Sequence, residues 1–262
     1  MSRPIDALLA RKVNEIDKSE VEAIGLMGSY SRGEAKLYSD VDLVCLLKQG
    51  LTEKEATIEI IEDTYVVTSY VTIAEMEECF TDPDSATVNI LGLQQVKILY
   101  DLNETFENLR VRAYQFRWTE DLQAKANELV SKELVGWIEE VHKALQGFIS
   151  DDVGRMLNGI FGLTYGIFTI VRKQKGILLN GENSFYTKIV GYYGFDSSFA
   201  KLAEKAWGIG ATKSIKERVV AGLLLFDEVT DELMGVLREE DKPAVVLAKR
   251  EIHVELKSRG YI

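Results

Sequence analysis

The sequence predicts an α+β protein, in which a small mixed β-sheet domain is followed by an all-helical bundle domain. Short runs rich in apolar and β-branched residues, separated by turn residues, fill the chain up to about residue 108. From about residue 115 onward the apolar residues recur with the helical period instead. We place the boundary between the two patterns so that the domains span 1–112 and 113–262.

The first half begins with an amphipathic helix over 5–18, whose apolar residues share helical spacing. Apolar runs then predict strands at 23–27, 41–47, 65–72 and 96–100. A short helix is expected within 29–36, a longer one over 73–80, and a turn at Asp82-Pro83-Asp84. The segment 57–62 alternates Ile and Glu and is compatible with either a strand or a short helix. Together these elements form a small mixed sheet with helices packed on it.

The second half reads as an antiparallel helical bundle. Helical periodicity covers 119–147, 153–175, 197–207, 213–238 and 241–258, with glycine-rich breaks between several of these segments. The most apolar stretch runs from Met156 to Val171, which is shorter than the roughly 20 residues that a membrane span requires. Gly159, Gly162 and Gly166 interrupt it. We therefore expect a buried bundle helix whose glycines let a neighbouring helix approach closely.

The composition indicates an ordered, reduced protein. Of 262 residues, 46% are hydrophobic and 28% are charged, which is enough to bury a core and argues against disorder. The two cysteines are Cys45 and Cys79, and Cys45 lies inside an apolar strand, where a buried free thiol is expected. The chain begins Met1-Ser2-Arg3-Pro4 without the pattern of a signal peptide. We expect a cytoplasmic protein with no membrane partner.

The net charge of the protein indicates which kind of molecule it binds. A formal net charge of −11 disfavours a nucleic-acid partner, which would favour a basic face. The same charge suits a small cationic molecule, attracted by the field of the whole protein.

The most informative stretch is Gly28-Ser29, followed by residues 30–39 and then by Asp40-Val41-Asp42. It lies between two predicted strands, so a small-residue bend is followed by two carboxylates at the beginning of the second strand. Alternate residues of a strand point to the same face, so Asp40 and Asp42 can converge on one point. Paired carboxylates opposite a loop with free backbone N–H groups can hold Mg²⁺ against the phosphates of a nucleotide.

This arrangement resembles the nucleotidyltransferase superfamily of the DNA polymerase β type. The signature of that superfamily is Gly-Ser, an intervening segment and Asp-x-Asp, and residues 28–42 match its spacing. The length of the chain and its helical second half are closest in layout to the aminoglycoside and lincosamide antibiotic nucleotidyltransferases. The resemblance implies a Mg²⁺-dependent transferase that uses ATP as co-substrate.

The resemblance also implies roles for individual residues. Asp40 and Asp42 become catalytic metal ligands. Nucleotide contacts are implied for Gly28, Ser29, Arg32 and Ser39. Catalysis of such a reaction depends mostly on positioning the reactants and on supplying positive charge, because the transition state spreads negative charge over the phosphoryl oxygens.

One position departs from the superfamily pattern. Active members carry a third carboxylate on the next central strand, and by alignment that position falls near Val67, in a strand without acids. Three explanations remain open. The acid is Glu59, Glu62 or Asp63; or a carboxylate of the helical half, Glu139 or Glu140, acts as the catalytic base; or catalysis has been lost and the protein only binds nucleotide.

The leading hypothesis is transfer of a nucleoside monophosphate, AMP from ATP, to a hydroxyl of a small cationic antibiotic-like acceptor. The alternative is a catalytically inactive nucleotide-binding protein of regulatory or antitoxin-like type. The partners expected are a nucleoside triphosphate and the acceptor, and a homodimer remains an open alternative.

Overall fold

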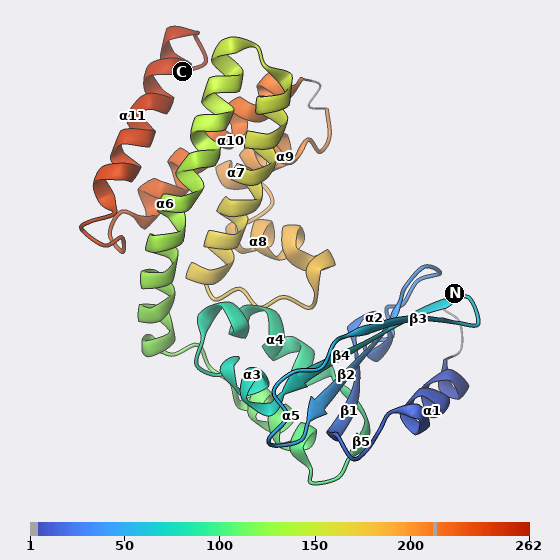
Figure 1. Ribbon diagram of the computed structural model, residues 1–262. Helices are drawn as coiled ribbons and strands as arrows, with labels where there is room; N and C mark the ends of the chain where they lie inside the picture. The colour runs from blue at the N-terminus through green and yellow to red at the C-terminus, as the bar shows by residue number, and fades with distance from the viewer. Residues whose placement is uncertain (1–4, 212–213) are drawn as a thin grey trace. The chain divides into compact units, whose positions relative to one another are not determined.

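The computed structural model describes residues 5–211 and 214–262 (Figure 1). Residues 1–4, on which the expectation about a signal peptide rests in part, and residues 212–213, which include the expected start of the helix at 213, lie outside the described residues. The chain forms two compact units. The first comprises Met1–Trp118 with Leu178–Glu182, and the second comprises Thr119–Ile177 with Asn183–Ile262.

The first unit is built on a five-stranded sheet with the order β3-β4-β2-β1-β5. The strands are β1 Val21–Met27, β2 Val41–Leu47, β3 Thr57–Ile61, β4 Thr64–Thr72 and β5 Lys97–Asp101. β2 and β4 are parallel and the other neighbours are antiparallel, so the predicted mixed sheet and the α+β class are confirmed. The undecided segment 57–62 forms β3, which turns into β4 through Glu62 and Asp63, both at positive φ.

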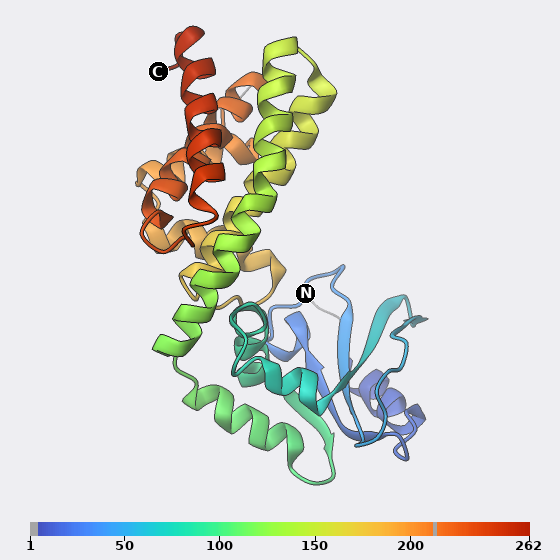
Figure 2. The same cartoon turned by 60° about the vertical axis from the view of Figure 1, so that its left-hand side comes forward.

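Helices cover both faces of this sheet, which Figure 2 shows nearly edge-on. α1 Asp6–Glu15 packs on one face through Leu8 and Leu9, against Leu43 and Val66 of the sheet. The other face carries a core formed by α3 Ile73–Glu78, α4 Pro83–Gln95 and α5 Thr105–Gln115. A short helix, α2 Gly28–Ser31, follows β1 directly.

The turn expected at 82–84 is wrong, because these residues begin α4. The Asp82 carboxylate accepts the Ser85 backbone N–H at 2.7 Å, and Pro83 occupies the first helical turn. Asp before Pro favours a turn and a helix start alike, and here the apolar residues that follow decide for a helix. Ile90 and Leu93 of this helix are fully buried against the sheet.

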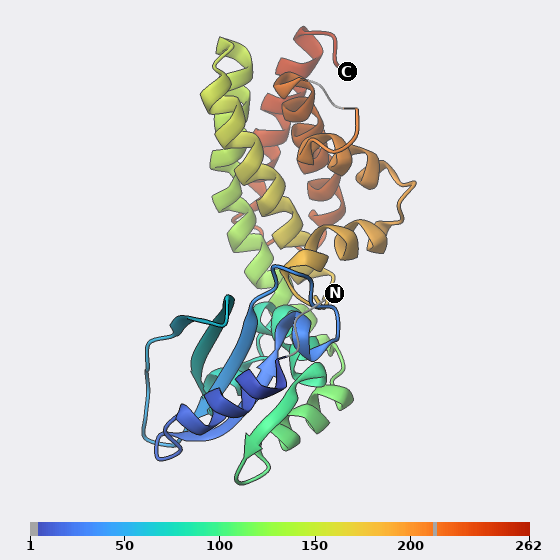
Figure 3. The same ribbon diagram turned by 90° about the vertical axis from the view of Figure 1, so that its right-hand side faces the viewer.

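The second unit is helical, as predicted. Its helices are α6 Glu120–Ser150, α7 Val153–Gln174, α8 Phe185–Tyr193, α9 Ser198–Trp207, α10 Ile215–Leu233 and α11 Lys242–Ser258, and a 3₁₀ turn spans Glu182–Ser184. α6 and α7 run side by side (Figure 3). A side chain at Gly159 would lie 2.5 Å from the Ala144 backbone nitrogen, and one at Gly166 would lie 2.3 Å from the Trp137 ring. The predicted close approach at the α7 glycines is therefore confirmed.

A five-residue segment of the second half of the chain belongs to the first unit. This strap, Leu178–Glu182, is attached to the first unit by the Leu179 backbone N–H, which donates to the Thr87 carbonyl oxygen at 2.8 Å. Leu179 is buried, and Leu178 packs against the α3–α5 core. The sheet domain is therefore completed by residues that lie about 60 positions beyond its last helix in the sequence.

Both cysteines are free and buried, as expected for Cys45. Burial raises the pKa of the Cys45 thiol to about 11 and that of Cys79 to about 12. Within the residues described here, none of the helices combines the length and the apolarity needed to cross a bilayer.

Candidate active site

Asp42 lies at the beginning of β2, the central strand of the sheet, between β1 and β4. It pairs with Met27 of β1 on one side and with Val67 of β4 on the other. Because alternate residues of a strand share a face, its side chain lies on the α4 face of the sheet with Val44 and Leu46. The following residue, Leu43, packs against α1 on the opposite face.

The Asp42 carboxylate lies against Gly28. A side-chain carbon added at Gly28 would lie 1.9 Å from Asp42 Oδ2, and the backbone of Gly28 has a φ of +66°. Two separate reasons therefore require glycine at this position. The backbone is left-handed, and the Asp42 carboxylate fills the space that a side chain would need. The acidic group and the glycine-serine bend are in direct contact.

The surroundings of Asp42 oppose its ionisation. Burial raises the pKa of this carboxyl to about 6, with a further increase from the neighbouring charge of Asp40, while Arg32 lowers it. Asp40 precedes the strand and is exposed. Two carboxylates that repel one another at the mouth of a loop form a group of charges that a cation would stabilise.

Arg32 is held beside this pair. Its side chain is only 16% exposed, and its Nε donates to Glu34 Oε2 at 2.7 Å. Gly181 of the strap approaches it, so that a side chain there would lie 3.6 Å from the guanidinium. The strap therefore borders the site, a contact for which the sequence offers no local signal because the two residues are almost 150 positions apart.

The other residues for which nucleotide contacts were predicted belong to the same loop. The backbone carbonyl of Ser29 accepts the Glu34 N–H at 2.9 Å, which closes the bend. The Ser39 hydroxyl accepts the Lys36 backbone N–H at 2.8 Å and so fixes the turn that leads to Asp40. Ser31 Oγ donates to the Gly28 carbonyl at 2.9 Å. The loop is thus ordered by its own hydrogen bonds.

The strand next to Asp42 supplies no third acid. Val67 is the register partner of Asp42, as the alignment suggested, and carries no carboxylate. Glu59 lies on the opposite face, where it pairs with the buried Lys12 of α1, so it cannot join Asp42. Glu62 and Asp63 form the hairpin turn between β3 and β4.

Glu139 and Glu140 lie on α6 of the second unit. Lys143 Nζ lies 2.8 Å from a carboxylate oxygen of each. The Glu139 side chain is 73% exposed, whereas that of Glu140 is 16% exposed and lies over Gly162. Both residues line a shallow hollow of about 440 Å³ with Glu133, Trp137 and Lys173.

The donor set fits a hydrated Mg²⁺ ion better than a closed metal cage. Among the residues that the structure describes, no three His, Cys, Asp or Glu side chains gather as a metal site. Mg²⁺ bound with a nucleotide commonly uses one or two carboxylates, and its other ligands are water and phosphate oxygens. Asp40 and Asp42 are the residues that would hold it.

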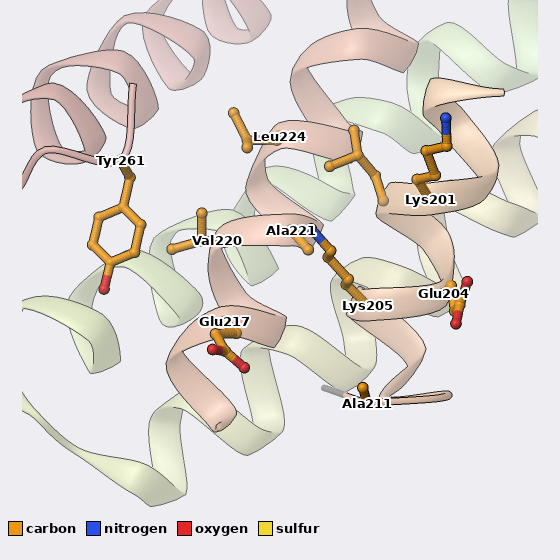
Figure 4. Close-up of a pocket in the computed structure, with 10 residues that line it drawn as sticks. Lys201, Glu204, Lys205, Ala211, Glu217, Val220, Ala221, Leu224 and Tyr261 are labelled. Carbon is orange, nitrogen blue, oxygen red and sulfur yellow. The ribbon is translucent and has the colours of Figure 1, made fainter. Parts of the chain in front are cut away.

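The helical unit contains another hollow, of about 470 Å³, between α9, α10 and Tyr261 (Figure 4). Lys201 and Lys205 line it together with Glu204 and Glu217, over an apolar floor. Its two cationic and two anionic side chains balance, so it has no charge preference that would identify a ligand.

Comparison with known proteins gives a family match within the first unit. The family model described as nucleotidyltransferase domain matches residues 8–88, which include Gly28, Ser29, Asp40 and Asp42. The chain is also similar to a nucleotidyltransferase-like protein of known structure from Exiguobacterium sibiricum. The identity is 11% and the TM-score 0.46, over 97% of this chain and 79% of that one. No curated protein matches. The domain match supports nucleotidyl transfer as the general function.

Proposed function

We propose that the protein transfers a nucleoside monophosphate, AMP from ATP, to a hydroxyl of a small cationic acceptor of the antibiotic type. The observation that carries the proposal is the contact of the Asp42 carboxylate with Gly28, beside Asp40 and within the matched domain. Acidic groups beside a glycine-serine bend suit a metal-bound triphosphate better than a purely structural turn.

In this proposal Asp40 and Asp42 would hold Mg²⁺, which would supply positive charge to the phosphate oxygens. Gly28 and Ser29 bind the triphosphate, Ser39 fixes the approach to Asp40, and Arg32 binds a phosphate. The acceptor oxygen forms a bond to the α-phosphorus while the bond to the bridging oxygen breaks. Pyrophosphate leaves with the electron pair, and the hydroxyl proton passes to a base.

Glu140 is the better of the two proposed bases. It is largely buried, Lys143 pairs with it, and the missing side chain of Gly162 leaves room for its carboxylate, whereas Glu139 is mostly in solvent. The hollow that contains both residues also includes Glu133, which pairs with Lys173 at 2.7 Å. Its three acids outnumber the one lysine that lines it, and together with the net charge of −11 this excess supports a cationic acceptor. We place the reaction in the cytoplasm, with which the two free cysteines are compatible.

Pyrophosphate release tests this proposal. The wild-type protein, with Mg²⁺ and each of the four nucleoside triphosphates, is assayed against a panel of aminoglycosides and lincosamides. Asp42→Asn and Asp40→Asn should abolish turnover, and Glu140→Gln should reduce it strongly. The control Asp196→Asn removes an exposed carboxylate of the second unit and should change nothing. Absence of release from every donor and acceptor would contradict the proposal.

A second candidate is a nucleotide-binding protein without turnover, and the valine at position 67 favours it. Val67 stands in register with Asp42 where active members of the superfamily carry an acid. A pure binder would keep metal-dependent ATP affinity and release no pyrophosphate, so the same assay combined with an ATP titration separates the two functions.

A further inference from the structure

One part of the sheet carries exposed apolar side chains. Ile58 and Ile60 of β3 are 71% and 68% exposed, and Tyr65 of β4 is 59% exposed. Val67, next to Tyr65 on the same face, is partly exposed. We call these four residues the platform. Large apolar side chains gathered on an open face commonly mark a binding surface.

The platform adjoins the two carboxylates. Asp42 pairs with Val67, and Val67 pairs with Ile58, so the three form one row across the sheet. Tyr65 pairs with Ile60 in the neighbouring row. Val41 pairs with Val66, and Asp40 and Tyr65 are the residues that directly precede this pair in the two parallel segments. With neighbouring strands about 4.8 Å apart, Ile58 lies about 10 Å from Asp42 across the sheet.

β3 reverses the usual polarity of an edge strand. Its Glu59 points to the face covered by α1 and pairs there with Lys12, whereas its isoleucines point to the open face. Edge strands normally carry charge outward because exposed apolar edges promote aggregation. Further along the same face Val44, Leu46 and Val71 are packed against the helices, so the platform is the part of this face that the helices of the first unit leave open.

We propose that the platform binds an apolar or aromatic part of the hydroxyl acceptor. The inference rests on the proposed transfer reaction and names the chemistry of its acceptor: a hydroxyl compound with a flat apolar portion beside the reacting group. A cationic group elsewhere in the same molecule is compatible with it.

The direction of the reaction places the acceptor, and not the nucleotide, on the platform. Gly28 and Ser29, the triphosphate residues of the proposal, follow β1 on one side of Asp42, and the platform lies on the other side. In phosphoryl transfer the attacking and leaving oxygens lie roughly in line on opposite sides of the phosphorus. Pyrophosphate therefore leaves on the β1 side, and the acceptor oxygen attacks from the β4 side.

The platform is tested by measuring the affinity of three small probes. Saturation-transfer NMR is carried out on the full chain in the presence of a nonhydrolysable ATP analogue and Mg²⁺. 2-Naphthol has a hydroxyl and a flat apolar ring, tyramine adds an ammonium group, and 2-deoxystreptamine has hydroxyls and ammonium groups without an apolar face. We expect 2-naphthol and tyramine to bind more tightly than 2-deoxystreptamine. The double variant Ile58→Thr/Ile60→Thr should weaken the binding of both aromatic probes by about tenfold, because it removes apolar contact area.

The control is Val111→Thr, which makes the same kind of change at an exposed apolar residue of α5. It should leave the affinity for all three probes unchanged. Tyr65→Ser, made separately, repeats the test if the double variant does not fold. Equal affinity of the three probes, or no loss in either platform variant, overturns the inference. So does a wild-type protein that dimerises through the platform, seen as a dimer that the double variant abolishes.

Failure of this inference differs from failure of the proposed function. If the wild type binds Mg²⁺-ATP and Asp42→Asn does not, while the aromatic probes bind no more tightly than 2-deoxystreptamine, only the inference about the platform is wrong. If Mg²⁺-ATP does not bind at all, the transfer reaction is wrong, and binding of the probes no longer identifies them as acceptors.

Discussion

At the scale of single residues, the contact between Asp42 and Gly28 was predictable in part. The spacing from Gly28 to Asp42 and the alternation of strand residues predict that the Asp42 carboxylate lies opposite the Gly28-Ser29 bend. The spacing does not reveal that the carboxylate occupies the volume of a glycine side chain, or that burial raises the pKa of Asp42 to about 6. Both depend on tertiary packing.

Asp42→Asn should stabilise the metal-free protein in a pH-dependent way. The pKa of this carboxyl rises from 3.8 to about 6 on folding, so the native state binds more protons between these values. The wild type therefore loses stability as the pH rises through this interval, whereas the neutral amide does not. Because Asp42 keeps part of its surface in water, we expect a gain of about 1 kcal/mol at neutral pH. Thermal unfolding in EDTA at several pH values measures it, and a gain that does not shrink below pH 6 would contradict the assignment.

Gly28→Ala should abolish Mg²⁺-ATP binding, because the new methyl group would overlap Asp42 Oδ2 and displace the carboxylate. The matched control is Gly33→Ala. Gly33 has nearly the same φ, +70° against +66°, but open space around it. Both variants should lose about 1 kcal/mol of stability from backbone strain, and only Gly28→Ala should lose the nucleotide. Equal ATP affinity of the two variants by calorimetry would show that the contact with Asp42 is unimportant.

At the scale of elements, periodicity predicted the long helices well and the short elements poorly. α7 was expected at 153–175 and spans Val153–Gln174, because apolar periodicity over six turns leaves little ambiguity. β3 could not be assigned, since its Ile-Glu-Ile alternation fits a strand whose faces are reversed as well as a short helix. α4, α5 and α8 were not predicted; all three have 13 residues or fewer, and tertiary contacts contribute much of the stability of such helices.

Two glycine substitutions in the α6–α7 pair should have opposite effects on stability. Gly159→Ala should destabilise the protein by about 2 kcal/mol or more, because its methyl group would meet the Ala144 backbone. Gly136→Ala, in the interior of α6 with no atom within 4 Å of the new methyl group, should stabilise it by about 0.5–1 kcal/mol through higher helix propensity. Chemical denaturation measures both changes, and a shift of the same sign in the two variants would rule out close packing at Gly159.

At the scale of the whole molecule, the two-part organisation follows from the change in periodicity, and the strap does not. The division between the two units falls between Trp118 and Thr119, but Leu178–Glu182 returns to the first unit. The glycine-rich break expected near 176–181 marks where the helix ends, without indicating which unit the segment contacts. Such long-range pairings depend on three-dimensional packing that local patterns do not encode.

Leu179→Ala should destabilise the first unit selectively, although the residue lies in the second half of the chain. Truncation of a buried leucine costs about 2–5 kcal/mol, and Leu179 is 5% exposed. Hydrogen exchange should become faster in β1 and β2 and stay unchanged in α9 and α10. The control Leu157→Ala removes a leucine that is 48% exposed on α7, and should alter neither region. Faster exchange confined to the helical unit would show that the strap does not support the sheet.

The most direct test of the site is a calorimetric titration of ATP into the wild type and into Asp42→Asn, with Mg²⁺ and with EDTA. If Asp40, Asp42 and Gly28 form a metal-dependent nucleotide site, the wild type binds ATP in Mg²⁺ and much more weakly in EDTA, and the Asn variant binds weakly in both. Equal affinity in the four experiments, or no binding in any, would contradict it.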